Sequence, residues 1–155
     1  MELSEVRHAM ENCELFKGLD KKSIDKLIEI TKVENYQAGE YIFQQGDFGE
    51  RIYIIAEGHI YLERSANMGS RKGNAVIGML GRGRACGCWS TLLGESHNLM
   101  SSAICRKPTI ILSVSGPELR EIMIDNTELG FNVMEKLCFL LRDRIEGAYG
   151  AMEKI

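Results

Sequence analysis

Hydrophobic and polar residues follow a helical spacing at the start of the chain. Val6, Met10 and Cys13 form one apolar stripe, which predicts a helix over residues 3–16. Asp20 then stands where the cap of a second helix is expected. The apolar positions of that second helix are Ile24, Leu27, Ile28 and Ile30.

From about residue 33 the helical spacing gives way to short apolar runs separated by glycine-bearing turns. Runs of this kind, bounded by turn residues, are typical of the strands of an antiparallel sandwich, barrel or jelly roll. The polar segment 65–74 has the composition of an exposed hairpin loop. The runs predicted as strands are VENYQ (33–37), EYIFQ (40–44), RIYIIAE (51–57), HIYLERS (59–65), NAVIGML (74–80), SSAICR (101–106) and TIILSVS (109–115).

Helical spacing returns after Pro117, which suits the first turn of a short helix, PELREIMID. Asp125 and Glu128 then have the spacing of a capping box. They predict the start of a long helix over about 127–147.

This long helix has more apolar surface than one contact requires. A single barrel needs only one apolar stripe from it, so the excess favours a partner helix in a homodimer. Packing against its own barrel alone is the alternative. The seam, with separations of 4, 3, 4, 3 and 4 residues, is Met134, Cys138, Leu141, Ile145, Ala148 and Met152.

Composition and charge are those of an ordinary domain. The 155 residues carry 19 Lys+Arg against 22 Asp+Glu, a net charge of −3, and are 45% hydrophobic. There is no basic surplus of the kind that marks a nucleic-acid binder, and no apolar run approaches the ~20 residues of a membrane span. We expect one domain over 1–155, of mainly β class. It is a double-stranded β-helix or jelly-roll barrel (33–115) with N-terminal helices (3–32) and two C-terminal helices (116–150).

The five cysteines, in a chain without an export signal, favour reduced thiols and a cytoplasmic location. Cys86 and Cys88 form a C-x-C at the start of a predicted short helix, where a thiol pKa can be lowered. This permits a redox sensor or, with His97 and Cys105, a metal site. Small apolar fillers are the alternative. The cysteines predicted to pack on helical faces are Cys13 and Cys138.

The segment YQAGEYIFQQGDFGERIYIIAEGHIYLERS (36–65) carries several signatures in order. They are Gly39-Glu40 after a strand, Gly46-Asp47 at a turn, and Tyr53, Ile55 and Gly58 around a hairpin. In this order they resemble the first half of a cyclic-nucleotide-binding domain, of the catabolite-activator and protein kinase A regulatory subunit type. The resemblance covers about residues 13–147 and implies a non-enzymatic sensor or regulatory domain.

The resemblance also implies a phosphate-binding cassette, in which a Glu binds the ribose and an Arg binds the cyclic phosphate. Cys88 stands in place of that Glu and Leu99 in place of that Arg. Losing two charge-assisted hydrogen bonds costs about 3–6 kcal/mol, or on the order of a hundred-fold to ten-thousand-fold in affinity. The cassette is therefore degenerate, and we expect either a cyclic nucleotide bound with weak or altered affinity or another small anionic ligand.

The predicted ligand-binding residues follow the cassette frame. Arg82, Arg84 and His97 are the candidates to replace its lost cation. Trp89 offers a stacking face, with filling of the cassette–barrel interface as its alternative role. The whole predicted set is Gly87, Cys88, Trp89, Ser90, Leu99, Met100, Ser101 and Ser102.

Three hypotheses for function stay open at this point. The first is the ligand sensor, and the second is a dimerisation or protein-interaction domain whose pocket binds nothing. The third is a thiol-based redox sensor that uses Cys86 and Cys88. No catalytic triad, HExxH, Walker loop or paired-carboxylate motif supports an enzyme. The family's DNA-reading element would follow the long helix, so no DNA contact is expected from residues 1–155.

Overall fold

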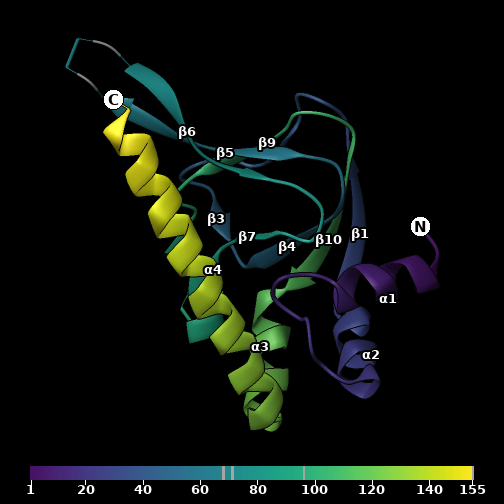
Figure 1. Ribbon diagram of the computed structural model, residues 1–155. Helices are drawn as coiled ribbons and strands as arrows, with labels where there is room; N and C mark the ends of the chain where they lie inside the picture. The colour runs from purple at the N-terminus through teal and green to yellow at the C-terminus, as the bar shows by residue number, and fades with distance from the viewer. Residues whose placement is uncertain (68, 71, 96, 155) are drawn as a thin grey trace.

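Figure 1 shows a computed structural model of the chain, which describes residues 1–67, 69–70, 72–95 and 97–154. The helices α1 (Leu3–Glu11) and α2 (Lys21–Glu29) precede the strands, and α3 (Gly116–Asp125) and α4 (Thr127–Glu153) follow them. The predicted fold class, mainly β with helices at both ends, is confirmed. The elements between are β1 (Thr31–Tyr36), β2 (Tyr41–Phe43), β3 (Phe48–Gly49), β4 (Arg51–Glu57), β5 (Ile60–Asn67), β6 (Lys72–Leu80), β7 (Ala85–Gly87), the 3-10 helix η1 (Trp89–Leu93), β8 (His97–Asn98), β9 (Ser102–Cys105) and β10 (Thr109–Ser115).

The strands pair antiparallel in two four-stranded sheets and one two-stranded sheet. Their orders are β1-β10-β4-β7, β2-β9-β5-β6 and β3-β8. Alternation along β4 sends Ile52 and Ile54 into a core shared with the helices and Ile55 into the barrel interior. One strand therefore serves two cores, which explains its nearly continuous apolar sequence.

The structure confirms two of the predicted helix starts and corrects a third. Asp20 caps α2 through its side chain, and Pro117 lies in the first turn of α3. The long helix is capped by Asn126, whose side-chain oxygen accepts a hydrogen bond from the Leu129 backbone N–H at 3.1 Å. The predicted cap, Asp125, is the last residue of α3, so it is not free to adopt the extended backbone of a cap.

The first helix is shorter than predicted. It ends at Glu11 instead of residue 16, and the Asn12 side chain donates to the His8 carbonyl oxygen at 2.7 Å. The turns that follow bury Leu15 and Phe16 completely in the core. The apolar residues after Glu11 are therefore buried in non-helical turns, and they do not continue the helix.

The sheet is more extensive than the apolar runs indicated. β3, β7 and β8 were not predicted, because two or three residues are too few to display a period of two. The predicted loop 65–74 is shortened, since β5 and β6 stay paired as far as Asn67 and Lys72. Residues 68 and 71 of that loop lie outside the described residues.

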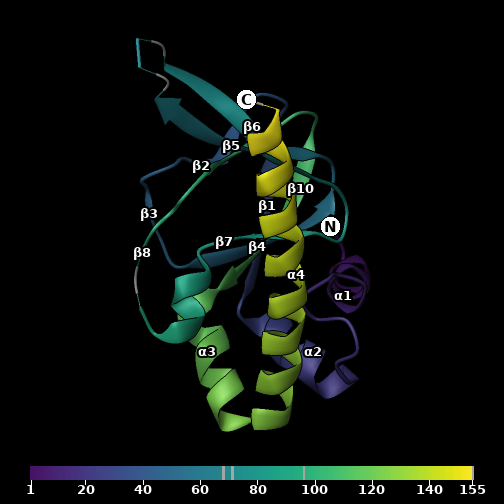
Figure 2. The ribbon, with the colours of Figure 1, turned by 60° about the vertical axis from the view of Figure 1, so that its left-hand side comes forward.

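The long helix α4 crosses the barrel diagonally and ends beside the β5–β6 hairpin (Figures 1 and 2). It continues to Glu153, beyond the predicted end at 147. Cys138 is exposed in the single chain, so its predicted packing on the α4 seam stays a prediction that requires a second copy. In the described part of the chain, no helix combines the length and the apolar character that crossing a membrane needs. The side chains of α4 that are buried against the core are Leu129, Val133, Leu137 and Leu140.

Candidate functional site

A pocket of about 210 Å³ lies where α4 crosses the barrel. Strands β2, β5 and β6 form one wall, and β7 with the start of η1 forms another. The segment before β9 and the middle of α4 complete it. The lining residues are Phe43, Leu62, Arg64, Ile77, Cys86, Gly87, Trp89, Met100, Ser101, Leu141 and Arg144.

The wall made by β7 depends on a glycine. Gly87 has φ +133°, and a Cβ at this position would lie 2.5 Å from the carbonyl oxygen of Arg51. Only glycine allows the chain to pass this close to β4 and then turn into η1. Trp89, the first residue of η1, is packed against the helical core on one side and lines the pocket. The predicted short helix of the cassette therefore forms as a single 3-10 segment.

The structure brings four of the eight predicted site residues together around this pocket, namely Gly87, Trp89, Met100 and Ser101. The other four do not line it. Ser90 lies within η1, and the Ser102 hydroxyl accepts a hydrogen bond from the Gln45 backbone N–H at 2.8 Å. Cys88 and Leu99 lie in the barrel core.

Cys88 and Leu99, the positions predicted to replace the family's charged residues, pack as apolar filling of the barrel core. These residues are 5% and 6% exposed, and both side chains lie close to Gly49. A Cβ at Gly49 would be 3.1 Å from Leu99 Cδ1 and 3.7 Å from Cys88 Cβ, so the packing is close. Met100, which is 64% exposed, lines the pocket from this segment together with Ser101.

The cations predicted to replace the cassette arginine lie elsewhere. Arg84 Nε is 2.6 Å from Glu14 Oε2, and Arg82 donates to the carbonyl oxygen of Ala56 at 3.3 Å. His97 is exposed on β8. None of the three lines the pocket beneath α4.

The pocket contains two different arginines, Arg64 from β5 and Arg144 from α4. Sequence reasoning missed both, because the apolar pattern does not reveal which strand lies beneath the long helix. Arg64 Nη1 donates to the Met100 carbonyl oxygen at 2.5 Å. Within the described residues, no carboxylate forms an ion pair with Arg64.

Arg144 is held more tightly than Arg64. Its side chain is 17% exposed, and Nη2 donates to the Ala85 carbonyl oxygen at 2.6 Å and to Glu14 Oε1 at 3.0 Å. Burial lowers the pKa of Arg144, and the negative charge of Glu14 opposes that shift. The two cations of the pocket are therefore in different states, one partnered by an acid and one not.

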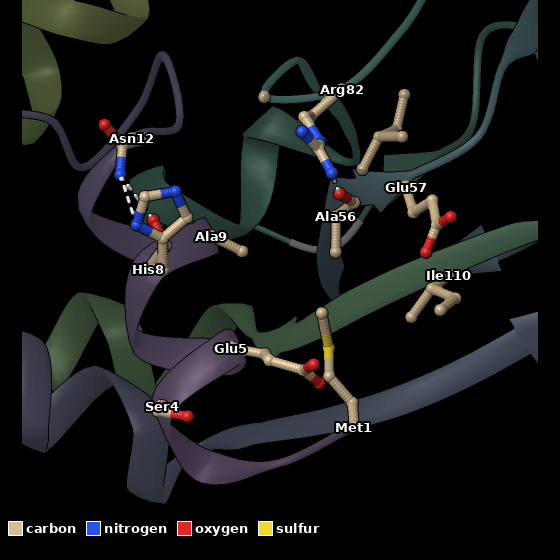
Figure 3. A pocket seen from close by; sticks show the side chains of 12 residues that line it. Met1, Ser4, Glu5, His8, Ala9, Asn12, Ala56, Glu57, Arg82 and Ile110 are labelled. Atoms are coloured by element: carbon tan, nitrogen blue, oxygen red, sulfur yellow. Dashed lines mark hydrogen bonds between the residues drawn. The ribbon is translucent and has the colours of Figure 1, made fainter.

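A second, larger hollow of about 640 Å³ lies between α1 and the barrel (Figure 3). Glu5 and His8 border it from α1, and Glu57 and Arg82 border it from the barrel side. Its polar side chains are largely engaged locally, since Asn12 bonds to His8 and Arg82 to Ala56. None of the predicted cassette residues lines this hollow, so the pocket beneath α4 is the candidate site.

The C-x-C cysteines lack the setting of a reactive pair. Cys86 lies in β7, three residues before the 3-10 helix begins, so no helix N-terminus stabilises its thiolate. Burial raises the pKa of Cys86 to about 12, opposite to the predicted direction. Among the described residues, no group of three or more His, Cys, Asp or Glu side chains is placed to hold a metal ion.

The jelly-roll barrel with a pocket between its cassette segment and a C-terminal helix is the architecture of a cyclic-nucleotide-binding domain. The sequence profile of the cyclic nucleotide-binding domain family matches residues 33–126, and the chain belongs to this family.

The relatives include regulators, a channel and cGMP-dependent protein kinases. The cyclic AMP receptor protein of Thermus thermophilus is 30% identical over 105 residues, which cover 68% of this chain and 46% of that protein. The cyclic nucleotide-gated channel beta-3 of Canis lupus familiaris is 26% identical over 132 residues, covering 84% and 16% respectively. A solved cyclic nucleotide-binding domain from Methylobacillus flagellatus has a TM-score of 0.78 at 20% identity, over 98% of this chain and 83% of that one. This chain spans less than half the length of either sequence relative.

The burial of four cysteines predicts a single reactive thiol. In a Cys138→Ser variant, we expect no fast reaction with a disulfide reagent at pH 8, because Cys86 stays protonated below its raised pKa and Cys13, Cys88 and Cys105 are buried. Four thiols should react after unfolding in denaturant, since the chain has five cysteines. A fast-reacting thiol in the folded variant contradicts this prediction.

The different placement of Leu99 and Met100 predicts different tolerance for a cation. Leu99→Arg buries a charge in the barrel core and should lower the free energy of unfolding by about 3 kcal/mol or more. Met100→Arg is at an exposed position and should change it by less than about 0.5 kcal/mol. Urea unfolding measures both, with Leu99→Met as the control for changed shape without charge. Equal stability of the two arginine variants contradicts the burial of position 99.

Proposed function

We propose that this chain is a non-enzymatic sensor or regulatory domain whose pocket beneath α4 takes a small anionic ligand and binds cAMP and cGMP weakly. The observation that carries the proposal is the exchange of charged groups within the pocket. Positions 88 and 99 contribute apolar filling, while Arg64 and Arg144 enter from outside the cassette. The two arginines keep the affinity of the pocket for an anion, but the carboxylate that would bind a ribose is lost.

The pocket is also suited to transmit binding. Leu141 and Arg144 belong to α4, and the other walls belong to the barrel, η1 and the segment before β9. A ligand in the pocket therefore contacts α4 and the barrel together. Binding then favours the position of α4 that makes the better contacts with the ligand. The cytoplasmic location and the absence of a DNA contact remain predictions from the sequence.

Calorimetry with a panel of ligands tests this proposal. We expect cAMP and cGMP to bind with a Kd of about 1 mM or weaker, because two charge-assisted contacts are lost. Inorganic phosphate and small carboxylates such as phenylacetate and benzoate form the second part of the panel, and at least one should bind more tightly. Arg64→Gln should weaken that binding, with Arg106→Gln, an exposed arginine over the Tyr61 ring, as the matched control. Micromolar affinity for cAMP contradicts the weak-nucleotide claim, and silence of the whole panel leaves the non-binding alternative.

One observation favours a second role, in dimerisation. Phe131, Cys138, Ile145 and Met152 recur every seven residues along α4, and all four are exposed. A seven-residue apolar repeat is self-complementary, because each position meets its own copy across a two-fold axis in a parallel pair. We infer that the occupant of this stripe is the α4 helix of a second copy.

Cross-linking through Cys138 tests the parallel pairing. Copper-phenanthroline oxidation should join two chains through Cys138 and give a species of twice the 17.4 kDa chain mass. Ile145→Asp should abolish the cross-linked species, because it would bury a charge in the seam. Ile124→Asp, at an exposed position on α3, should leave the cross-linked species unchanged. A monomeric mass in sizing chromatography, together with no cross-linked product, contradicts the dimer.

A further inference from the structure

The charges that line the pocket beneath α4 limit what can bind there. Arg64 and Arg144 are its charged residues, and the other described residues that line it are apolar or neutral. Its volume of about 210 Å³ is below the ~300–1,000 Å³ of pockets for drug-sized molecules. The complement of this surface is a compact molecule with one anionic group and an apolar body, such as an aromatic carboxylate.

One of the two arginines already has an anionic partner from the protein itself. Glu14, in the turns between α1 and α2, accepts a hydrogen bond from Arg144 Nη2 at 3.0 Å. The same Nη2 also donates to the Ala85 carbonyl oxygen at 2.6 Å, so this nitrogen already has two partners within the protein. Arg144 is therefore engaged by an internal carboxylate in the structure without ligand.

Glu14 has other partners that would remain after Arg144 left it. Arg84 Nε lies 2.6 Å from Glu14 Oε2, and the Ala85 backbone N–H donates to Oε1 at 2.9 Å. Two arginines thus share one carboxylate, which leaves one positive charge in surplus. An anionic ligand would give Arg144 a partner of its own, and Glu14 would keep Arg84 and Ala85. The exchange leaves no half-buried charge unpaired, which is what makes it feasible.

Arg144 also anchors the distal part of α4. The buried side chains of this helix end at Leu140, and Arg144 is the next residue that bonds to both the barrel and the N-terminal segment. Beyond it, Ile145, Tyr149 and Met152 are exposed. Release of Arg144 would therefore loosen the last three turns of the helix more than the first four.

We propose that Glu14 is an internal competitor for the ligand. It holds Arg144 and locks the distal part of α4 onto the N-terminal segment and the barrel. A compact anion with an apolar body, bound between Arg64 and Arg144, displaces Glu14 from Arg144 and releases the lock. This inference rests on the proposed function and adds to it the class of ligand and the route by which binding reaches the N-terminal segment.

The single tryptophan, Trp89, lines the pocket and reports binding through its fluorescence. The probe is phenylacetate, with neutral phenylacetamide as its matched control. Glu14→Gln keeps an acceptor for Ala85 but removes the competing charge, so phenylacetate should bind about fivefold to tenfold more tightly. Asp25→Asn, which removes the partner of Arg7 in the α1–α2 ion pair, is the control and should leave the affinity unchanged.

A second measurement detects the lock without ligand. Amide hydrogen exchange over residues 145–153 should be about fivefold faster in Glu14→Gln than in the wild type, and unchanged in Asp25→Asn. Unchanged or weaker phenylacetate binding in Glu14→Gln overturns the competition, even if exchange is faster. No response to phenylacetate in either the wild type or Glu14→Gln also overturns it. The proposed function fails on different results: no binding by any member of the ligand panel, or micromolar affinity for cAMP.

Discussion

The carboxylate of Glu14 is the contact on which the geometry of the site depends. It joins three segments that are distant in the sequence, because it pairs with Arg84 and Arg144 and accepts the backbone N–H of Ala85. Glu14 and Arg144 are both largely buried, so their attraction is screened less than that of an exposed pair. Without this carboxylate, two arginines of like charge would face each other beside the first residue of β7. The strand that leads into the cassette and the helix that covers the pocket are therefore positioned by the same group.

The two cores of the barrel show how the cassette segment keeps its backbone shape with apolar side chains at positions 88 and 99. β4 and β7 each place alternate residues in the helical core and in the barrel interior, with Ala85 on one side and Cys86 on the other. Gly87 keeps the close approach to β4 that the turn needs. The frame depends on these backbone constraints, so apolar side chains at positions 88 and 99 are tolerated. The charge that contacts a ligand can then come from β5 and α4.

Much of the fold could be predicted from the sequence, and the site could be predicted only in outline. The seven predicted runs each overlap an observed strand, because runs of this length show their alternation or their bounding turns. β3, β7 and β8 are too short to show either, and Asn126 caps α4 because a local hydrogen bond outweighs the motif spacing. Arg64 and Arg144 could not be found from spacing, since their proximity results from how α4 crosses the barrel. The pKa of Cys86 follows from burial, which neighbouring residues in the sequence do not reveal.

The placement of α4 would make the proposed ligand binding and the proposed self-association thermodynamically dependent on each other. One side of the helix contributes Leu141 and Arg144 to the pocket, and another side carries the exposed stripe from Phe131 to Met152. A ligand that frees Arg144 changes the position of the same turns that would meet a second copy. Because coupling between two binding events is reciprocal, a partner helix that holds the distal turns in the released position must raise ligand affinity by the same factor. A partner that holds them in the locked position must lower it. The sign of that coupling therefore depends on whether the dimer forms with Glu14 and Arg144 paired or with the pair separated.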